Sequence, residues 1–257
     1  HYTMGRTIQA LLGLFEIPFR VLEPDEVDLA EKVDEARAHC ESTSLPYAFL
    51  IKKGTFSPVE TARPAEGGGL AQRHEYIRAL DELTDDRSVL LGATGYCGRE
   101  LYHLVASPNK FYMMGSMGCL AAVGLALAEE NRKKRIYVLD GDGALLMKMG
   151  TMSTVGYHGS ENLVHICFDN GVYESTGGQP TTAPRTDFAG VAEACGYRSF
   201  ESVESVSDFR SVIFASRDRP GPHFVAVRIA LGTLDNLPRP SEDAVMMKRS
   251  LSRALNS

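Results

Sequence analysis

The chain has 257 residues, a formal net charge of −6 and 44% hydrophobic residues, which is enough for one large α/β core and part of another. No apolar run is long enough to span a membrane, and the largest basic cluster, at 132–135, fits a solvated helix end, so we expect neither a membrane nor a nucleic-acid partner. The five cysteines lack the paired spacing of a zinc site, which favours a reduced, cytoplasmic protein.

Residues 1–58 alternate short helical and strand patterns. We expect helices at 7–14 and 26–42, and apolar strands at 19–22 and 46–52. Two helices and two strands of this size do not easily close a core of their own. The region therefore looks like the C-terminal part of an α/β domain whose beginning is absent, and the opening His1 suggests a fragment.

A polar segment rich in proline and glycine, residues 59–70, is predicted to be a linker. After it, residues 71–257 alternate helix and strand patterns. We expect helices at 72–83, 97–106, 117–130, 187–195, 207–216 and 243–255, and strands at 88–92, 136–139, 163–168 and 222–229. This series predicts a self-sufficient doubly wound α/β domain with a mostly parallel sheet.

Two polar turns follow apolar strands in this domain. The strand at 136–139 ends in Gly141-Asp142-Gly143, and the strand at 163–168 ends in Asp169-Asn170-Gly171. The 25 residues between the turns leave room for one helix and two connections, which predicts a βαβ unit with parallel strands. Both turns then lie at the carboxyl edge of the sheet, where open α/β sheets bind their ligands.

The residue types in these turns favour a metal-bound diphosphate. The carboxylate of Asp142 and the amide oxygen of Asn170 are ligands suited to Mg²⁺ or Ca²⁺. The flanking glycines let the backbone approach a bulky anion, and a helix beginning after Gly143 would point free N–H groups at it. Taken alone, each motif is equally compatible with an ordinary turn after a strand.

Two earlier segments also place small residues beside predicted elements. The strand at 88–92 leads into Thr94-Gly95, and the helix after it carries Arg99, which is also compatible with a solvated surface position. The stretch 114–126 repeats small residues on one helical face, which permits close packing. Its Met117 is equally compatible with ordinary core packing.

The Gly-Asp-Gly turn, the spacing of 25 residues and the Asn-containing turn together resemble the signature of thiamine-diphosphate enzymes. The segments 2–7 and 46–56, and above all Asp-Asn-Gly-Val-Tyr-Glu-Ser-Thr-Gly-Gly-Gln-Pro at 169–180, look like phosphonopyruvate and sulfopyruvate decarboxylases. The resemblance spans nearly the whole chain. It implies a thiamine-diphosphate-binding fold for 71–257 and the end of a pyrimidine-binding domain for 1–58.

The resemblance also implies a ligand set. Asp142, Asn170 and the backbone carbonyl of Val172 would hold Mg²⁺, which in turn would hold the diphosphate. One departure is that Asp169 stands where the family usually has asparagine, which places a carboxylate near an anionic cofactor unless it turns away or pairs. The implied cofactor-binding residues are Thr94, Gly95, Gly115, Met117, Asp142, Gly143, Ala144, Asn170, Val172 and Tyr173.

The implied reaction is the non-oxidative decarboxylation of 3-phosphonopyruvate, a small 2-oxo acid with a phosphonate group, to phosphonoacetaldehyde and CO₂. Such a substrate needs cationic or N–H donors near the mouth of the site. The substrate-contact candidates are Glu174, Ser175, Thr176 and Arg185. The family's activating glutamate would belong to the missing earlier segment, so no catalytic residue is assigned in this chain.

Three alternatives remain open. A sulfopyruvate decarboxylase has the same machinery and recognises a different acid. An acetolactate synthase-like ligase would normally carry a middle domain, for which the short linker leaves no room. An inactive fragment that binds Mg²⁺ and diphosphate weakly is also compatible with the absence of the glutamate. Because family members place the cofactor between two subunits, the resemblance further implies a homo-oligomer, a dimer or a tetramer.

Overall fold

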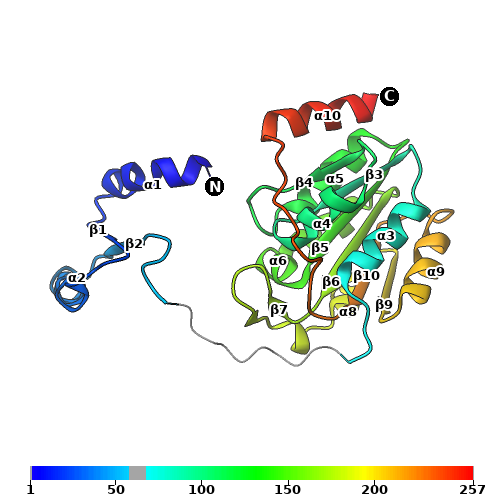
Figure 1. The fold of residues 1–257 in the computed structure, drawn as a ribbon. Helices are drawn as coiled ribbons and strands as arrows, with labels where there is room; N and C mark the ends of the chain where they lie inside the picture. Colours follow the sequence, from blue (N-terminus) through cyan, green and yellow to red (C-terminus); the bar gives the residue numbers. More distant parts are fainter. Residues whose placement is uncertain (1, 58–67, 257) are drawn as a thin grey trace. The chain divides into compact units, whose positions relative to one another are not determined.

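A computed structural model describes residues 2–57 and 68–256 (Figure 1). The chain divides into two compact units, with the boundary after Ala62. The predicted linker at 59–70 lies for the most part outside the described residues, and the domain boundaries at 58 and 71 stay predictions. No helix in the described part of the chain is both long and apolar enough to cross a membrane.

The first unit is a small βαβ arrangement preceded by a helix. Its elements are α1 (Tyr2–Leu14), β1 (Phe19–Leu22), α2 (Leu29–Thr43) and β2 (Ala48–Ile51), with β1 and β2 paired in parallel. Among the residues of this unit whose burial is described, only Leu22 and Ala36 are buried. The unit therefore has very little core of its own, as its size and pattern predict.

The second unit is built on a six-stranded sheet whose strands are all parallel, in the order β4-β3-β5-β6-β10-β9 (Figure 1). The strands are β3 (Ser88–Gly92), β4 (Lys110–Tyr112), β5 (Arg135–Gly141), β6 (Leu163–Asp169), β9 (Ser199–Val203) and β10 (His223–Arg228). The predicted doubly wound α/β fold is confirmed, although β4 and β9 were not predicted from the sequence.

Two groups of helices pack with this sheet. One group is α3 (Arg73–Leu83), α4 (Tyr96–Leu104) and α9 (Val206–Ser216), and the other is α5 (Leu120–Glu130), α7 (Gly150–His158) and α8 (Phe188–Ala194). The remaining elements are α6 (Asp142–Met147), the short β7 (Val172–Tyr173) and β8 (Gln179–Pro180), the 3₁₀ turn η1 (Ala183–Arg185) and α10 (Ala244–Asn256).

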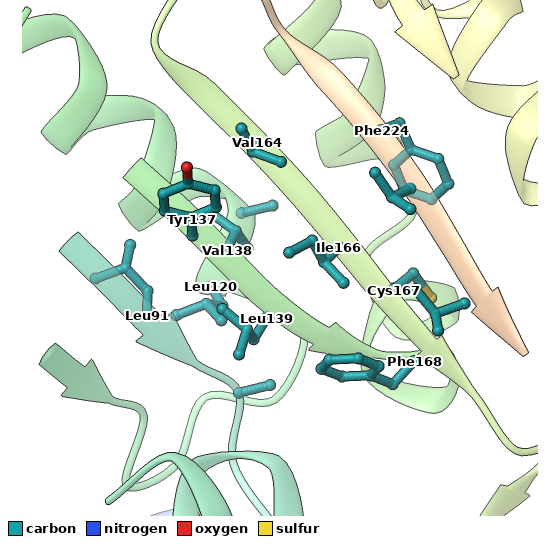
Figure 2. Close-up of a cluster of buried hydrophobic side chains, with 14 of the residues drawn as sticks. Leu91, Leu120, Tyr137, Val138, Leu139, Val164, Ile166, Cys167, Phe168 and Phe224 are labelled. Atoms are coloured by element: carbon teal, nitrogen blue, oxygen red, sulfur yellow. The ribbon is translucent and has the colours of Figure 1, made fainter. Parts of the chain in front are cut away.

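The core lies along the two central strands. All seven residues of β6 are buried, as are the five from Ile136 to Asp140 in β5, because a parallel sheet with helices packed against it buries its central strands. Figure 2 shows side chains of this core from β3, β5, β6, β10 and the start of α5. Tyr76 of α3 and Phe168 of β6 extend the core toward α9.

Two predicted helices differ from the structure. The helix expected at 117–130 begins only at Leu120, because Ser116 and Gly118 have positive φ angles of 51° and 82° and form a turn before it. The single helix expected between the two polar turns is two helices, α6 and α7, which are separated at Lys148 and Met149. Both helical segments are therefore shorter than the sequence pattern predicts, and turns replace the missing helical residues.

Candidate functional site

The polar turns at 141–143 and 169–171 lie at the same edge of the sheet. Strands β5 and β6 are parallel neighbours, and Gly141 lies opposite Phe168 in their register. A cavity of about 230 Å³ opens at this edge. It is lined by Arg73, Thr94, Gly95, Tyr96, Cys97, Met117, Gly141, Asp142, Gly143, Ala144, Phe168, Asn170, Val172, Tyr173, Glu174, Ser175 and Thr176. The expectation that both turns lie at one edge of the sheet is therefore confirmed.

Asp142 is a buried carboxylate at the first position of α6, with 3% of its surface exposed. Its Oδ2 accepts a hydrogen bond of 2.7 Å from the Thr181 hydroxyl. Burial raises the pKa of Asp142 to about 6, the Thr181 hydrogen bond opposes this rise, and the nearby charge of Asp169 adds to it. In the part of the chain that the structure describes, Asp142 makes no ion pair. A desolvated carboxylate of this kind suits a bound cation.

Asn170 follows the end of β6. Its Oδ1 accepts a hydrogen bond of 3.1 Å from the Val172 backbone N–H, and its Nδ2 donates one of 3.0 Å to Glu174 Oε2. Because an amide oxygen has two lone pairs, Oδ1 keeps one acceptor position for a further ligand. Val172 is buried and lines the same cavity.

Asp169, the departure from the usual asparagine, is neutralised by a cation. Its Oδ2 lies 2.7 Å from Arg228 Nη1, and its Oδ1 accepts a hydrogen bond of 3.0 Å from the Gly171 backbone. Asp169 therefore does not bring an unpaired negative charge near the proposed anionic cofactor, because it pairs with Arg228. Asp169 does not line the cavity.

Three glycines line the cavity at the ends of β3 and β5. A Cβ on Gly143 would lie 2.3 Å from the Tyr173 ring, whereas a Cβ on Gly141 would meet nothing within 4 Å. Gly95 has a φ of 96°, which residues with a side chain rarely adopt, and a Cβ there would lie 3.0 Å from Ser175 Oγ. Gly143 therefore permits the close approach of the Tyr173 ring, whereas Gly141 leaves open space beside the end of β5.

Most of the predicted site residues line this cavity. Those brought together are Thr94, Gly95, Met117, Asp142, Gly143, Ala144, Asn170, Val172, Tyr173, Glu174, Ser175 and Thr176. Gly115 lies in a bend before the turn at 117–118 and does not line the cavity. Arg185 is exposed in η1 and does not line it either. The assigned roles of all these residues stay predictions.

Arg73 is a charged residue of this cavity that the sequence does not indicate. It begins α3, is 6% exposed and lines the cavity, with Nε 2.8 Å from Glu100 Oε2 and Nη2 3.5 Å from Glu174 Oε2. Its guanidinium also lies 5.8 Å from the centre of the Tyr96 ring. These partners are distant in the sequence, so no local pattern indicates that this arginine is buried.

The side chains at the two strand ends fit a hard cation that brings further ligands with it. Within the described ranges, no three His, Cys, Asp or Glu residues are grouped so that they could hold a metal by themselves. One carboxylate, one amide oxygen and a backbone carbonyl leave an Mg²⁺ octahedron incomplete, and Mg²⁺ usually completes its shell with phosphate oxygens and water. The accessible backbone at Gly141 leaves space for such a group.

Residues 93–227 match the family described as "Thiamine pyrophosphate enzyme, C-terminal TPP binding domain". The chain belongs to the thiamine pyrophosphate enzymes. The matched range contains both strand ends and nearly all of the residues that line the cavity. Arg73 lies before it.

Curated relatives of this thiamine pyrophosphate enzyme chain include two phosphonopyruvate decarboxylases. The protein of Streptomyces viridochromogenes is 36% identical over 93% of this chain, and that of Streptomyces hygroscopicus is 35% identical over 93%. The chain spans 64% and 63% of the lengths of these two relatives. The sulfopyruvate decarboxylase subunit beta of Methanothermobacter thermautotrophicus is 33% identical over 65% of this chain and is covered over 86% of its own length.

A solved structure supports the fold. It is described as that of a thiamin diphosphate-dependent enzyme from Mycobacterium smegmatis, and it superposes with a TM-score of 0.55 at 16% identity. The match covers 76% of this chain and 42% of that chain. At this identity the likeness shows a shared fold only.

Proposed function

We propose that this protein uses thiamine diphosphate and Mg²⁺ to decarboxylate 3-phosphonopyruvate to phosphonoacetaldehyde and CO₂. The observation that carries the proposal is the 36% identity to a phosphonopyruvate decarboxylase over 93% of the chain. The cavity at the ends of β5 and β6 supports it, because it combines an unpaired carboxylate, an amide oxygen and accessible backbone.

The residues of this chain bind and orient the cofactor. When bound, thiamine diphosphate supplies the electron sink that makes loss of CO₂ from a 2-oxo acid feasible. We assign Asp142, Asn170 and the carbonyl of Val172 to Mg²⁺. The backbones of Gly95, Gly143 and Ala144, with the hydroxyl of Thr94, are assigned to the diphosphate. Met117 is assigned to the organic part of the cofactor, and so is Gly115, although the described structure does not bring it to the cavity.

The substrate is proposed to meet the loop that follows β6. Glu174, Ser175 and Thr176 line the cavity, and the hydroxyls of the last two can donate hydrogen bonds to an anionic group. Arg185 is proposed as a phosphonate contact because it lies just beyond this loop. If Arg185→Ala leaves KM for 3-phosphonopyruvate unchanged, that role is wrong.

The proposal is tested by following CO₂ release from 3-phosphonopyruvate with Mg²⁺ and thiamine diphosphate present, each omitted in turn. Turnover that requires both supports the proposal. Cofactor binding without turnover of any 2-oxo acid would support the alternative of a binding fragment that lacks its activating glutamate. A rise in Tm on adding the cofactor and Mg²⁺ separates a working binding site from a scaffold that binds neither.

Sulfopyruvate is the second candidate substrate. This candidate is favoured because the chain covers 86% of the length of the Methanothermobacter thermautotrophicus sulfopyruvate decarboxylase beta subunit. It covers 64% of the length of the Streptomyces viridochromogenes phosphonopyruvate decarboxylase. Competition between the two acids at equal concentration decides between them. The acid with the larger kcat/KM is the substrate.

We also propose a homo-oligomer, a dimer or a tetramer, in a reducing, cytoplasmic setting. The supporting reason for assembly is the family resemblance, in which two subunits share a cofactor. All five cysteines are free thiols, which supports a reducing environment. Light scattering with and without the cofactor measures the assembly, and a monomer in both conditions would contradict it.

A further inference from the structure

Glu174 sits where three segments of the second unit meet. Its Oε2 accepts from Asn170 Nδ2 at 3.0 Å and lies 3.5 Å from Arg73 Nη2. Its Oε1 accepts from the backbone N–H of Gly232 at 2.5 Å. The carboxylate therefore receives donors from the start of α3, from the turn after β6 and from the segment after β10.

The chain holds this carboxylate in place more firmly than a surface glutamate. Its side chain is 18% exposed, and that of Arg73 is 7% exposed. Arg73 is itself fixed on its other side by Glu100, whose side chain is fully buried. Moving Glu174 would leave Arg73 and the Gly232 N–H without this acceptor, which is costly for buried donors.

The fixed position of Glu174 restricts the orientation of the Asn170 amide. The two ends of an amide have nearly the same shape, so its direction is set by the neighbouring groups. A carboxylate only accepts hydrogen bonds, so Glu174 requires the NH₂ end of the Asn170 amide to face it. The oxygen end is then directed away from Glu174, where it accepts from Val172 N–H at 3.1 Å.

We infer that Glu174 is a positioning residue that fixes the Asn170 amide with its oxygen available to a divalent cation, and that Arg73 holds Glu174 in the required place. This inference rests on the proposed function, because it concerns the same Mg²⁺ and diphosphate site. It gives Glu174 a role behind the metal ligand, distinct from contact with the substrate. Groups that orient metal ligands typically change metal affinity by about 10–100-fold when they are removed.

The test is a double-mutant cycle at positions 170 and 174. Glu174→Ala removes the acceptor of the Asn170 NH₂ end and leaves the amide held by the Val172 N–H without its second contact, and we expect Mg²⁺ affinity to fall by about 10–100-fold. Asn170→Asp has an oxygen at both ends, so its direction no longer matters. We therefore expect Asn170→Asp/Glu174→Ala to bind Mg²⁺ at least as tightly as Asn170→Asp alone.

The measurement is calorimetric titration of Mg²⁺ in the presence of thiamine diphosphate, repeated with Mn²⁺ and followed by electron paramagnetic resonance. Both readouts are independent of turnover. The matched control is Glu201→Ala, which also removes a glutamate, but from an exposed position of β9. This variant should keep the wild-type affinity for Mg²⁺. Glu174→Gln should recover only part of the affinity, because its single oxygen can face Asn170 and Arg73 in place of Oε2 while its NH₂ then meets the Gly232 N–H, where Glu174 Oε1 accepts.

Three outcomes overturn this inference. If the wild-type protein binds no Mg²⁺ with thiamine diphosphate, the proposed function fails and the inference fails with it. If the wild type binds and Glu174→Ala binds equally well, only the inference fails. If Glu174→Ala weakens Mg²⁺ binding by the same factor in the wild type and in Asn170→Asp, Glu174 does not act through the direction of the amide and has a general structural role. Should Glu174→Ala not fold, Glu174→Met keeps the side-chain volume without the acceptors and replaces it in the same cycle.

Discussion

The ends of β5 and β6 lie next to each other and each bears an aspartate, yet the two carboxylates have opposite surroundings. Asp142, after β5, is 3% exposed and has a hydroxyl as its side-chain partner. Asp169, at the end of β6, is paired with Arg228 at 2.7 Å. Among the described residues, the protein therefore neutralises one of these two carboxylates with an arginine and gives the other no ion-pair partner.

This difference separates a structural carboxylate from a candidate ligand. A buried, unpaired carboxylate costs free energy in the folded state, and its pKa rises as a result. A metal ion bound at that position would offset the cost. Residue type alone does not reveal this difference, because both positions are aspartates after a buried strand.

Among the substitutions that test the contrast between Asp142 and Asp169, Asp142→Asn is expected to have the largest effect on cofactor affinity. The amide is a weaker ligand for Mg²⁺ than a carboxylate, so we expect the affinity for thiamine diphosphate with Mg²⁺ to fall by more than about 100-fold. The folded protein without cofactor should be at least as stable as the wild type, because a buried unpaired charge is removed. Calorimetry and thermal unfolding measure the two effects, and unchanged cofactor affinity would contradict the contrast.

The pH dependence of the two strand ends should differ as well. The folded-state pKa of Asp142, about 6, lies above its ordinary value of 3.8, so the folded state binds more protons than the unfolded state between these values. Stability without cofactor should therefore fall by on the order of 2–3 kcal/mol as pH rises through this window, and Asp142→Asn should lack this fall.

Metal binding needs the deprotonated carboxylate, so Mg²⁺ affinity should fall as pH drops below about 6, by up to about tenfold per pH unit. Denaturant unfolding and calorimetric titration at several pH values check both trends. A stability profile that is the same in the wild type and in Asp142→Asn would show that Asp142 is not the group responsible.

A smaller effect is expected from Gly143→Ala, which tests the packing between the two loops. A Cβ at Gly143 would lie 2.3 Å from the Tyr173 ring, so the ring must move. We expect a loss of about 1–3 kcal/mol in stability, together with weaker cofactor binding. Gly141→Ala is the matched control, because a Cβ there meets nothing within 4 Å. Equal losses of stability from the two substitutions would contradict the close approach.

The smallest effect on cofactor binding is expected from Asp169→Asn. It removes the ion pair with the half-exposed Arg228, so we expect a loss of about 1 kcal/mol in stability. Asparagine is also the usual residue in the resembled family, and the carboxylate is already neutralised, so cofactor affinity should change by less than about threefold. A loss of affinity as large as that of Asp142→Asn would make the two strand ends equivalent.

Much of the second unit could be predicted from its sequence because its signals are local. The apolar runs of β3, β5, β6 and β10 and the periodic helices are readable from a few neighbouring residues. The Gly-Asp-Gly turn and its spacing to the Asn-containing turn also place the two polar groups at one sheet edge. The three-residue β4 and the edge strand β9, which carries Glu201, have too few buried positions to give a clear pattern.

The surroundings of the site could not be predicted because they depend on distant contacts. Arg73 is 27 residues from Glu100 and 101 residues from Glu174, and nothing in the sequence near it indicates burial. The pairing of Asp169 with Arg228 joins positions 59 residues apart. Sequence patterns therefore identified the ligand candidates, whereas the structure was needed to show which charges are neutralised and which are not.

The most direct measurement is a crystal structure with Mn²⁺ and thiamine diphosphate, in which the anomalous signal of Mn²⁺ locates the metal. The account predicts one metal ion within about 2.1–2.3 Å of both the Asp142 carboxylate and the Asn170 amide oxygen, with Asp169 still paired to Arg228. A metal ion bound to Asp169, or cofactor bound with no metal between Asp142 and Asn170, would contradict it.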